Sequence, residues 1–294
     1  VTGPDDWRSW QGAAGSFAIT RDVTDTALLL DALQALQPAA VFQVPLEESF
    51  VAALAEHPQL RVGYLTESPV GTPVSPAAKQ AVEEAAAFLA DQGWQVEEVQ
   101  WPTAGKDLME TYYLMNEGET AAMFDQIAAA IGRPVTQKDM EPLTWALYQT
   151  GRHVTASQYS RALSAWDAAG AQMAAFHEQY DLLLTPTTAT TAPRIDQPLN
   201  TPAELETMAH ITDLAPAEQQ RFIWDQWLAA LTKSPFTQQA NLTGEPAISL
   251  PTFVSDEGLP LGIQFVAGKG QEAKLLQVAK LFEEAGKFRF LHQN

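Results

Sequence analysis

The clearest pattern of apolar and polar residues lies near the C-terminus of the chain. Two runs rich in Ile, Leu, Val and Phe, at 247–250 and 261–267, are bounded by glycine and proline residues. Such runs are typical of buried strands. We expect the first strand to end at Pro251 and a polar helical turn to precede it, stopping at Gly244.

An amphipathic helix is predicted after the second of these strands. Gly268 and Gly270 open it, and Gly286 stands where a C-terminal cap belongs. Its apolar face comprises Ala273, Leu275, Leu276, Ala279 and Phe282. This strand–loop–strand–helix unit supplies the sheet to which the earlier segments must attach.

A βαβ unit is predicted further upstream. Residues 60–65 and 94–99 have strand patterns, and between them Ser75 is an N-cap followed by Pro76 in the first helical turn. Gly93 ends this helix. Its buried stripe should comprise Val82, Ala85, Ala86 and Leu89. Strand, helix and strand with short joins predict a parallel pair.

The N-terminal segment is predicted as a loop over 1–19, followed by a helix over 26–33 that packs against the sheet. The inward face of this helix should comprise Ala27, Leu30, Ala32, Leu33 and Leu36. Arg21 and Asp25 lie four residues apart at its start. An ion pair and an acidic first turn fit that position, so we interpret both residues as structural rather than catalytic.

The middle of the chain is mostly helical in pattern over 104–180, with a break at 132–134. A long helix over 158–180 ends this region. Its inward residues should be Leu163, Trp166, Ala169, Met173 and Phe176. The run 181–188 then reads as a short buried strand that leads into a loop rich in hydroxyl groups.

Further helices are predicted over 194–234, where an aromatic cluster suits a lid over a cleft. That cluster comprises Phe222, Ile223, Trp224 and Trp227. Since there is no internal repeat, linker or low-complexity tract, we predict a single domain over 1–294. The fold class is α/β, with a mixed β-sheet flanked by helices.

Composition narrows the range of partners. Of the 294 residues, 46% are hydrophobic and 18% are charged, which is typical of a globular protein with an ample core. The formal net charge of −19 argues against nucleic acid and against anionic membranes as partners. The chain has no cysteine, so disulfides, thiolate metal sites and a cysteine nucleophile are excluded.

The sequence starts with Val1 and not with methionine, which suggests that it begins inside a longer protein; a processed N-terminus is the alternative. We expect a cytoplasmic location.

Residue types alone identify no catalytic, metal or cofactor site. There is no Gly-x-Ser-x-Gly nucleophile elbow. The histidines at 57, 153, 177, 210 and 292 show no metal-ligand spacing. Residues 268–273 fit a dinucleotide fingerprint, but too few residues follow for a second strand with a ribose-binding acid. We predict no metal and no cofactor.

Several segments resemble the C-terminal portion of amidase signature enzymes. Asn-Leu-Thr-Gly-Glu-Pro-Ala-Ile-Ser-Leu-Pro at 241–251 is followed by Gly-Leu-Pro-Leu-Gly-Ile-Gln-Phe-Val at 258–266. Ile-Thr-Arg-Asp-Val-Thr-Asp-Thr-Ala-Leu-Leu-Leu-Asp-Ala stands at 19–32, and Asp-Leu-Leu-Leu-Thr-Pro-Thr at 181–187. The resemblance covers the chain from about residue 10 and implies hydrolysis of a carboxylic amide, with a small-molecule amide as substrate.

The resemblance also implies a Ser nucleophile, a bridging Ser and a Lys base. The family carries the serines in a Gly-Gly-Ser-Ser-Gly-Gly stretch upstream of the Thr-Arg motif, which starts here at Thr20. This chain has neither a Gly-Gly nor a Ser-Ser dipeptide. We therefore expect the triad to lie in a missing N-terminal portion of the same protein. The chain alone should be inactive, and apolar surface should be exposed where that portion docks.

Four residues are candidates for substrate binding on the same resemblance. The helix after residue 104 walls the substrate cleft in the family, which suggests Tyr112 and Asn116. The loop after 181–187 approaches the acyl side of the pocket, which suggests Thr187 and Thr188. Each has a structural alternative, because aromatic residues at this spacing also fit a core and threonine hydroxyls also cap local backbone.

Two other functions stay open. Within the resembled family, residues 18–21 and the acid-rich segment 116–119 are most similar to hydrolases of the 6-aminohexanoate-cyclic-dimer type. An A subunit of a glutamine-dependent tRNA amidotransferase is the first alternative, but its usual Arg-Tyr-Asp-Gly element is replaced here by Asn-Glu-Gly-Glu. A non-catalytic binding or structural module is the second.

Overall fold

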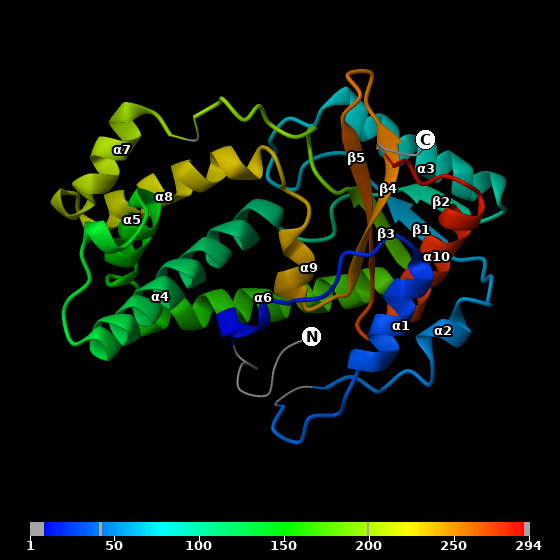
Figure 1. Ribbon diagram of the computed structural model, residues 1–294, viewed down its shortest axis with the longest axis horizontal. Coiled ribbons are helices and arrows are strands. Elements are labelled where there is room, and N and C mark those ends of the chain that lie inside the picture. The colour runs from blue at the N-terminus through cyan, green and yellow to red at the C-terminus, as the bar shows by residue number, and fades with distance from the viewer. Residues whose placement is uncertain (1–8, 41–42, 199, 291–294) are drawn as a thin grey trace. The chain divides into compact units, whose positions relative to one another are not determined.

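The computed structural model describes residues 9–40, 43–198 and 200–290, which gather into two compact units (Figure 1). The first unit draws on 1–104, 169–192 and 232–294, and the second on 105–168 and 193–231. The long helix α6 (Ala156–His177) contributes to both. The single domain that we expect from the sequence stays a prediction.

A five-stranded mixed sheet forms the centre of the first unit, in the order β2-β1-β3-β5-β4. Its strands are β1 (Arg61–Tyr64), β2 (Gln95–Glu98), β3 (Leu182–Pro186), β4 (Ala247–Val254) and β5 (Pro260–Ala267). Strand β1 runs parallel to both β2 and β3, whereas β5 is antiparallel to β3 and β4. The predicted α/β class, mixed sheet and parallel pair are confirmed.

Both faces of this sheet are covered with apolar residues, which explains the continuous apolar run in β3. Leu182 and Leu184 pack into a cluster with residues of α3 (Pro76–Asp91) and α10 (Glu272–Glu284). Leu183 points to the opposite face and packs in a cluster with Met173 of α6 and Ala240 of α9 (Gln238–Thr243). This alternation is the two-residue period of a strand, buried here on both sides.

Helix α3 forms as its sequence predicts. The Ser75 hydroxyl accepts a hydrogen bond from the amide of Ala78 at 3.2 Å, and proline occupies the first turn. Gly93 follows the helix with a φ of 85°, the left-handed conformation that ends many helices. All four residues of the predicted stripe are buried. Strong local signals therefore fixed this element.

The N-terminal segment differs from the prediction. Ser9–Gly12 form a short 3-10 turn inside the expected loop, whose residues 1–8 lie outside the described ranges. Helix α1 (Val23–Leu33) begins earlier than expected because Asp22 caps it, accepting from the amide of Asp25 at 2.8 Å. No ion pair joins Arg21 to Asp25 within the part of the chain that the structure describes.

The predicted inward face of α1 is wrong in part. Val23, Ala27 and Leu30 point inward, whereas Ala32, Leu33 and Leu36 are exposed, and Leu36 lies beyond the helix. The helix packs on α2 (Phe50–Ala53) and α10 rather than directly on the sheet. The leucines at 28, 29, 30 and 33 are spread around this helix, so sequence periodicity does not single out the one that is packed inward.

Strand β4 continues past Pro251, where we expect it to end. A bulge lies between Leu250 and Phe253, and the strand ends at Val254. Proline is tolerated because β4 is an edge strand, where no neighbour on its outer side needs its missing N–H. The carbonyl oxygen of Pro251 instead accepts from the amide of Arg289 at 2.7 Å.

The second unit is helical. It contains α4 (Gly105–Ile131), α5 (Pro142–Gly151), α7 (Pro202–Ala209), α8 (Pro216–Leu231) and two 3-10 turns, Gln137–Asp139 and Ile211–Asp213. Gly132, with a φ of 71°, ends α4 at the predicted break. Two apolar clusters hold the unit together, one around Ile223 and Met208 and one around Tyr148.

Helix α10 follows β5 through the glycine turn that resembles a dinucleotide fingerprint. Because β5 is antiparallel to both of its neighbours, this turn does not belong to a parallel βαβ unit. Gly270, with a φ of 74°, serves the tight turn instead. Within 9–40, 43–198 and 200–290, no helix combines the length and apolar character needed to cross a lipid bilayer.

Candidate functional site

Two hydroxyl groups meet at the carboxyl end of β3. Thr187 follows this strand, and its hydroxyl lies 2.7 Å from that of Ser249 on β4. The amide of Thr187 donates to the carbonyl oxygen of Gly262 on β5 at 3.0 Å, which fixes its position. In open α/β sheets ligands bind outside the carboxyl ends of the parallel strands, and β3 is one of them. We call Thr187 and Ser249 the hydroxyl pair.

Gly262 leaves the room that the hydroxyl pair occupies. A Cβ at this position would lie 2.8 Å from the Ser249 hydroxyl oxygen and 3.0 Å from that of Thr187. It would also lie 3.3 Å from the carbonyl oxygen of Leu250. Ser249 is exposed and Thr187 is partly exposed, so the pair offers a ligand both hydroxyl donors and acceptors.

A buried glutamine supports the pair from within the sheet. Gln264 lies opposite Thr185 on β3 and opposite Ser249 on β4. Its side-chain amide donates to the Thr185 hydroxyl and to the carbonyl oxygen of Phe236, each at 3.3 Å. Because Gln264 is buried, these bonds tie β5 to β3 and to the segment before α9, close to the hydroxyl pair.

Thr188 has a different environment from Thr187. Its hydroxyl donates to the carbonyl oxygen of Thr190 at 2.9 Å, so it stabilises the local loop backbone. Two backbone hydrogen bonds hold this loop. The amide of Ala189 donates to the carbonyl oxygen of Lys233, and the carbonyl oxygen of Ala189 accepts from the amide of Ser75. The lone pairs of the Thr188 oxygen can still accept a bond from a ligand. Its role in substrate binding stays a prediction.

Tyr112 and Asn116 lie four residues apart on α4 and therefore on one side of that helix. Tyr112 is half-buried and Asn116 is buried. The neighbouring Tyr113 is a core residue, because its ring stacks on Trp227 of α8 with centroids 4.7 Å apart. Tyr112 and Asn116 remain candidates for contact with substrate.

Glu117 is a buried acid that sequence reasoning missed. Glu117 is 3% exposed. Burial raises the pKa of its carboxyl to about 8, although a hydrogen bond with Gln220 lowers that pKa in part. The carboxyl is therefore protonated at neutral pH. One of its oxygens has no hydrogen-bond partner among the described residues. A glutamate inside a polar helical segment reads as exposed, so no sequence signal marks it.

A buried His–Glu pair lies in the first unit. His177 Nδ1 is 3.0 Å from the carbonyl oxygen of Tyr180, and Nε2 is 3.4 Å from Glu245 Oε1. The hydroxyl of Thr243 donates to the other oxygen of Glu245 at 2.7 Å. Since Nε2 has no hydrogen-bonded hydroxyl in the described part of the chain, this pair lacks the serine of a Ser–His–acid triad.

Metal-binding geometry is likewise missing where side chains are described: no group of three His, Asp or Glu residues converges there. The histidine at 292 falls outside the described ranges. The hydroxyl pair offers hydrogen-bond donors and acceptors, which are groups that can orient a ligand.

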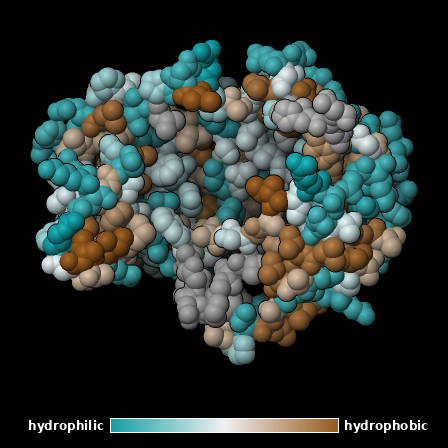
Figure 2. All heavy atoms as spheres, viewed as in Figure 1, coloured by the Kyte–Doolittle hydropathy of each residue, from teal (hydrophilic) through white to brown (hydrophobic). Residues whose placement is uncertain are grey.

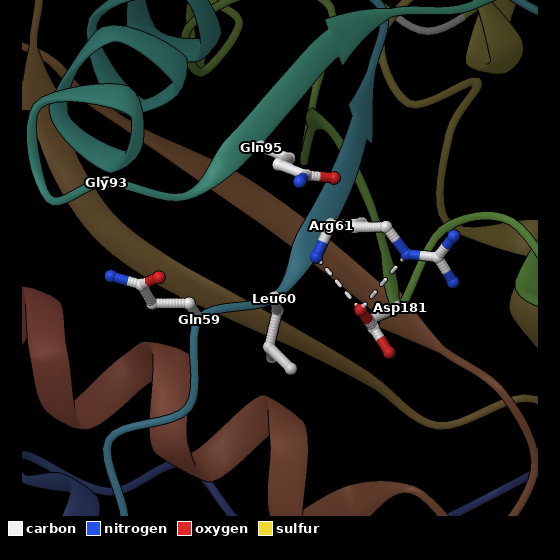
Figure 3. A pocket seen from close by; sticks show the side chains of 6 residues that line it. All are labelled: Gln59, Leu60, Arg61, Gly93, Gln95 and Asp181. Carbon is white, nitrogen blue, oxygen red and sulfur yellow. Dashed lines mark hydrogen bonds and ion pairs between the residues drawn. The ribbon is translucent and has the colours of Figure 1, made fainter.

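A polar pocket of about 300 Å³ lies at the opposite end of the parallel strands (Figure 3). It is lined by Gln59, Leu60, Arg61, Gly93, Gln95 and Asp181. Arg61 begins β1 and Gln95 begins β2, so the pocket lies at the amino ends of these strands, away from the usual ligand position.

Asp181 is fully engaged in this pocket. Figure 3 shows its carboxylate directed at Arg61, whose backbone amide donates to Asp181 Oδ2 at 2.9 Å. The Nζ atom of Lys274, which the figure does not draw, lies 2.8 Å from Asp181 Oδ1. Burial alone would raise the pKa of Asp181, but these bonds outweigh it and hold that pKa below its ordinary value. The pocket therefore reads as an ion-paired structural feature.

Comparison with known proteins gives a consistent result. Residues 14–276 match the sequence model of the Amidase family. The chain is 43% identical over 284 residues to a lipoamidase from Enterococcus faecalis, and 32% identical over 279 residues to a 6-aminohexanoate-cyclic-dimer hydrolase from Paenarthrobacter ureafaciens. A solved structure of 6-aminohexanoate cyclic dimer hydrolase superimposes with a TM-score of 0.78 at 30% identity.

These matches cover nearly all of this chain but much less of its relatives. The chain is covered to 97% by the lipoamidase and to 93% by the hydrolase, whereas it spans 38% and 54% of their respective lengths. The superposition likewise covers 93% of this chain and 55% of the solved one. The chain thus spans about half, or less, of the relatives that it matches.

Proposed function

This chain belongs to the amidase family, and we propose that it forms the C-terminal portion of an enzyme that hydrolyses a carboxylic amide to an acid and an amine. The observation that supports this most directly is the hydroxyl pair at the carboxyl end of β3, in a chain whose residues 14–276 match the family. We place the nucleophile, its bridging serine and its lysine base in a portion of the protein outside this chain.

The reaction then proceeds by acyl transfer. The serine oxygen supplied by the other portion bonds to the amide carbon, the C–N bond breaks, and the amine leaves with a proton. Water next attacks the ester so formed, releasing the acid and restoring the serine hydroxyl. In this scheme the residues of the present chain hold the substrate in a reactive orientation and supply no nucleophile.

Thr187 is the main substrate-binding residue in this proposal. Its hydroxyl is fixed by Ser249 and its amide is already bonded to Gly262, so little conformational entropy is lost when it binds a ligand. Thr188 contributes an acceptor from the same loop. Tyr112 and Asn116, on one side of α4, are proposed to contact the substrate as well.

The proposed substrate class is a linear or cyclic aliphatic amide. The names of the two relatives, a lipoamidase and a 6-aminohexanoate-cyclic-dimer hydrolase, support this choice. The four proposed binding residues are uncharged, which suits a neutral amide better than a charged substrate.

The experiment compares this chain alone with a polypeptide that joins it to the matching upstream segment of the Enterococcus faecalis lipoamidase. We expect the joined polypeptide to open the ring of the 6-aminohexanoate cyclic dimer, which exposes a new amino group, or to release ammonia from lipoamide. The chain alone should do neither. Turnover by the purified chain alone contradicts the proposal. Failure of a folded joined polypeptide on both amides contradicts it as well.

Thr187→Val in the joined polypeptide tests the binding role, with Thr190→Val as the matched control. Loss of one hydrogen bond to a neutral group should raise KM about tenfold for the first variant, because such a bond contributes about 1 kcal/mol or somewhat more. Thr190 donates its hydroxyl to the backbone of Thr191, so its loss should leave KM within about twofold.

A further inference from the structure

Exposed apolar side chains are concentrated in one stretch of the first unit. More than half of the large apolar side chains that are exposed among the described residues fall between residues 17 and 46. They are Phe17, Ile19, Leu28, Leu29, Leu33, Leu36, Val44 and Leu46. Figure 2 shows hydrophobic residues gathered over α1 and the segment beside it. A contiguous apolar surface of this kind marks an interaction site.

Helix α1 carries apolar residues on two opposite sides. Val23 and Ala27 are buried against α2 and α10 in the core of the first unit. On the outward side Leu28 is 52% exposed, Leu29 38% and Leu33 45%. Three leucines this exposed on one short helix are more than the scattered single apolar residues of an ordinary surface. We call Leu28, Leu29 and Leu33 the outer face of α1.

The outer face is held in a fixed orientation. At the start of α1 the amide of Val23 donates to the Glu283 carboxylate of α10 at 2.8 Å. Near its end Asp31 caps α2, accepting from the amide of Phe50 at 2.7 Å and from the Ser49 hydroxyl at 3.0 Å. These bonds at both ends of α1 hold its outer leucines at the surface of the first unit.

We propose that the outer face of α1 is the docking surface for the N-terminal portion of the amidase. This inference rests on the proposed function, which places the nucleophile in that portion. The chain spans 54% of the length of the Paenarthrobacter hydrolase and 55% of the solved one, so a comparable length of polypeptide is available to cover the face. An anionic membrane is disfavoured by the net charge of −19.

The test uses two separate polypeptides: this chain and the upstream segment of the Enterococcus faecalis lipoamidase. The docking variant is Leu28→Ser/Leu33→Ser. The matched control is Met123→Ser/Ile127→Ser on α4, where both side chains are similarly exposed. All replaced residues are exposed, so circular dichroism should show that both variants fold. We expect the docking variant to weaken binding at least about tenfold and the control to bind like the wild type.

Carbene footprinting of the wild-type chain gives a second measurement that does not depend on a variant. Labelling of Leu28, Leu29 and Leu33 should fall when the lipoamidase segment is added. The proposal is overturned if the docking variant binds as tightly as the wild type, if labelling does not change, or if the segment fails to bind. It is also overturned if the wild-type chain pairs with a second copy through α1 in preference to the segment.

Activity separates this inference from the proposed function. A complex that depends on Leu28 and Leu33 but hydrolyses no amide supports the docking surface and contradicts the amidase assignment. An active complex that the docking variant leaves intact contradicts the docking surface and supports the amidase assignment.

Discussion

Gly151 on α5 lies so close to Glu117 on α4 that a Cβ at position 151 would stand 1.9 Å from the carbonyl oxygen of Glu117. That oxygen belongs to the backbone and cannot move without a shift of the whole helix. The second unit therefore depends on glycine at this crossing, and the same crossing fixes the helix turn that carries Asn116 and Glu117.

Gly151→Ala should destabilise the protein strongly. Overpacking at a backbone contact forces the two helices apart, and we expect a loss of at least about 3 kcal/mol in the free energy of unfolding. Chemical denaturation followed by circular dichroism measures it. Gly170→Ala on α6 is the matched control, since a Cβ there meets nothing closer than 3.8 Å. The control variant should leave the free energy of unfolding unchanged or raise it by up to about 1 kcal/mol, because alanine is more stable than glycine inside a helix. Equal stability of the two variants would show that the helices do not cross this closely.

Glu117 should make stability depend on pH. The unfolded chain releases the glutamate proton near its ordinary pKa of 4.5, whereas the folded protein holds it until about pH 8. Unfolding therefore releases a proton between these values, and stability falls as pH rises through that window by about 1.4 kcal/mol per unit. Above pH 8 this contribution becomes constant.

Glu117→Gln replaces the protonated acid with a neutral side chain of similar shape. The free energy of unfolding of this variant, minus that of the wild type, should rise from pH 5 to pH 8 by a few kcal/mol, on the order of 4. Denaturant titrations at several pH values provide the curves. Glu110→Gln, at an exposed position of the same helix, serves as the control for loss of one charge and should track the wild type. A constant difference between Glu117→Gln and the wild type would rule out the buried, protonated state.

Gly262→Ala should disrupt the hydroxyl pair. The new methyl group would lie 2.8 Å from Ser249 Oγ, and we expect a cost of about 1 to 3 kcal/mol in stability. Ser249→Ala removes the nearest atom, so the double variant should recover part of that loss. A double-mutant cycle measures the coupling, which we expect to be at least about 0.5 kcal/mol. Strict additivity would mean that Gly262 does not face Ser249.

Much of the first unit could be predicted because its signals are local. Ser75, Pro76 and Gly93 delimit α3 by capping chemistry, and the apolar run in β3 follows from burial on both faces. The continuation of β4 past Pro251 could not be predicted, because it depends on the strand being at the edge of the sheet. The prediction of the inward face of α1 was wrong in part for a related reason. The leucines of α1 are spread around the helix, and packing against α2 and α10 determines which of them is packed inward.

The candidate site shows the same limit. The hydroxyl-rich loop after β3 identified Thr187, but its partner Ser249 comes from a strand more than sixty residues away and is matched to it by register. Ser249 lies within the 241–251 motif, but nothing in that motif indicates that its hydroxyl meets Thr187. Glu117 could not be identified from the sequence either, because its raised pKa arises from burial in the folded protein and not from residues that neighbour it in the sequence.

Trapping of the acyl-enzyme tests the central claim most directly. The chain and the upstream lipoamidase segment would be mixed as separate polypeptides, treated with an activated acyl ester, quenched in acid and analysed by intact mass spectrometry. We predict that the acyl group adds to the upstream segment and that the 294-residue chain keeps its unmodified mass. An acyl adduct on a serine or lysine of this chain, formed in proportion to turnover, would contradict the account.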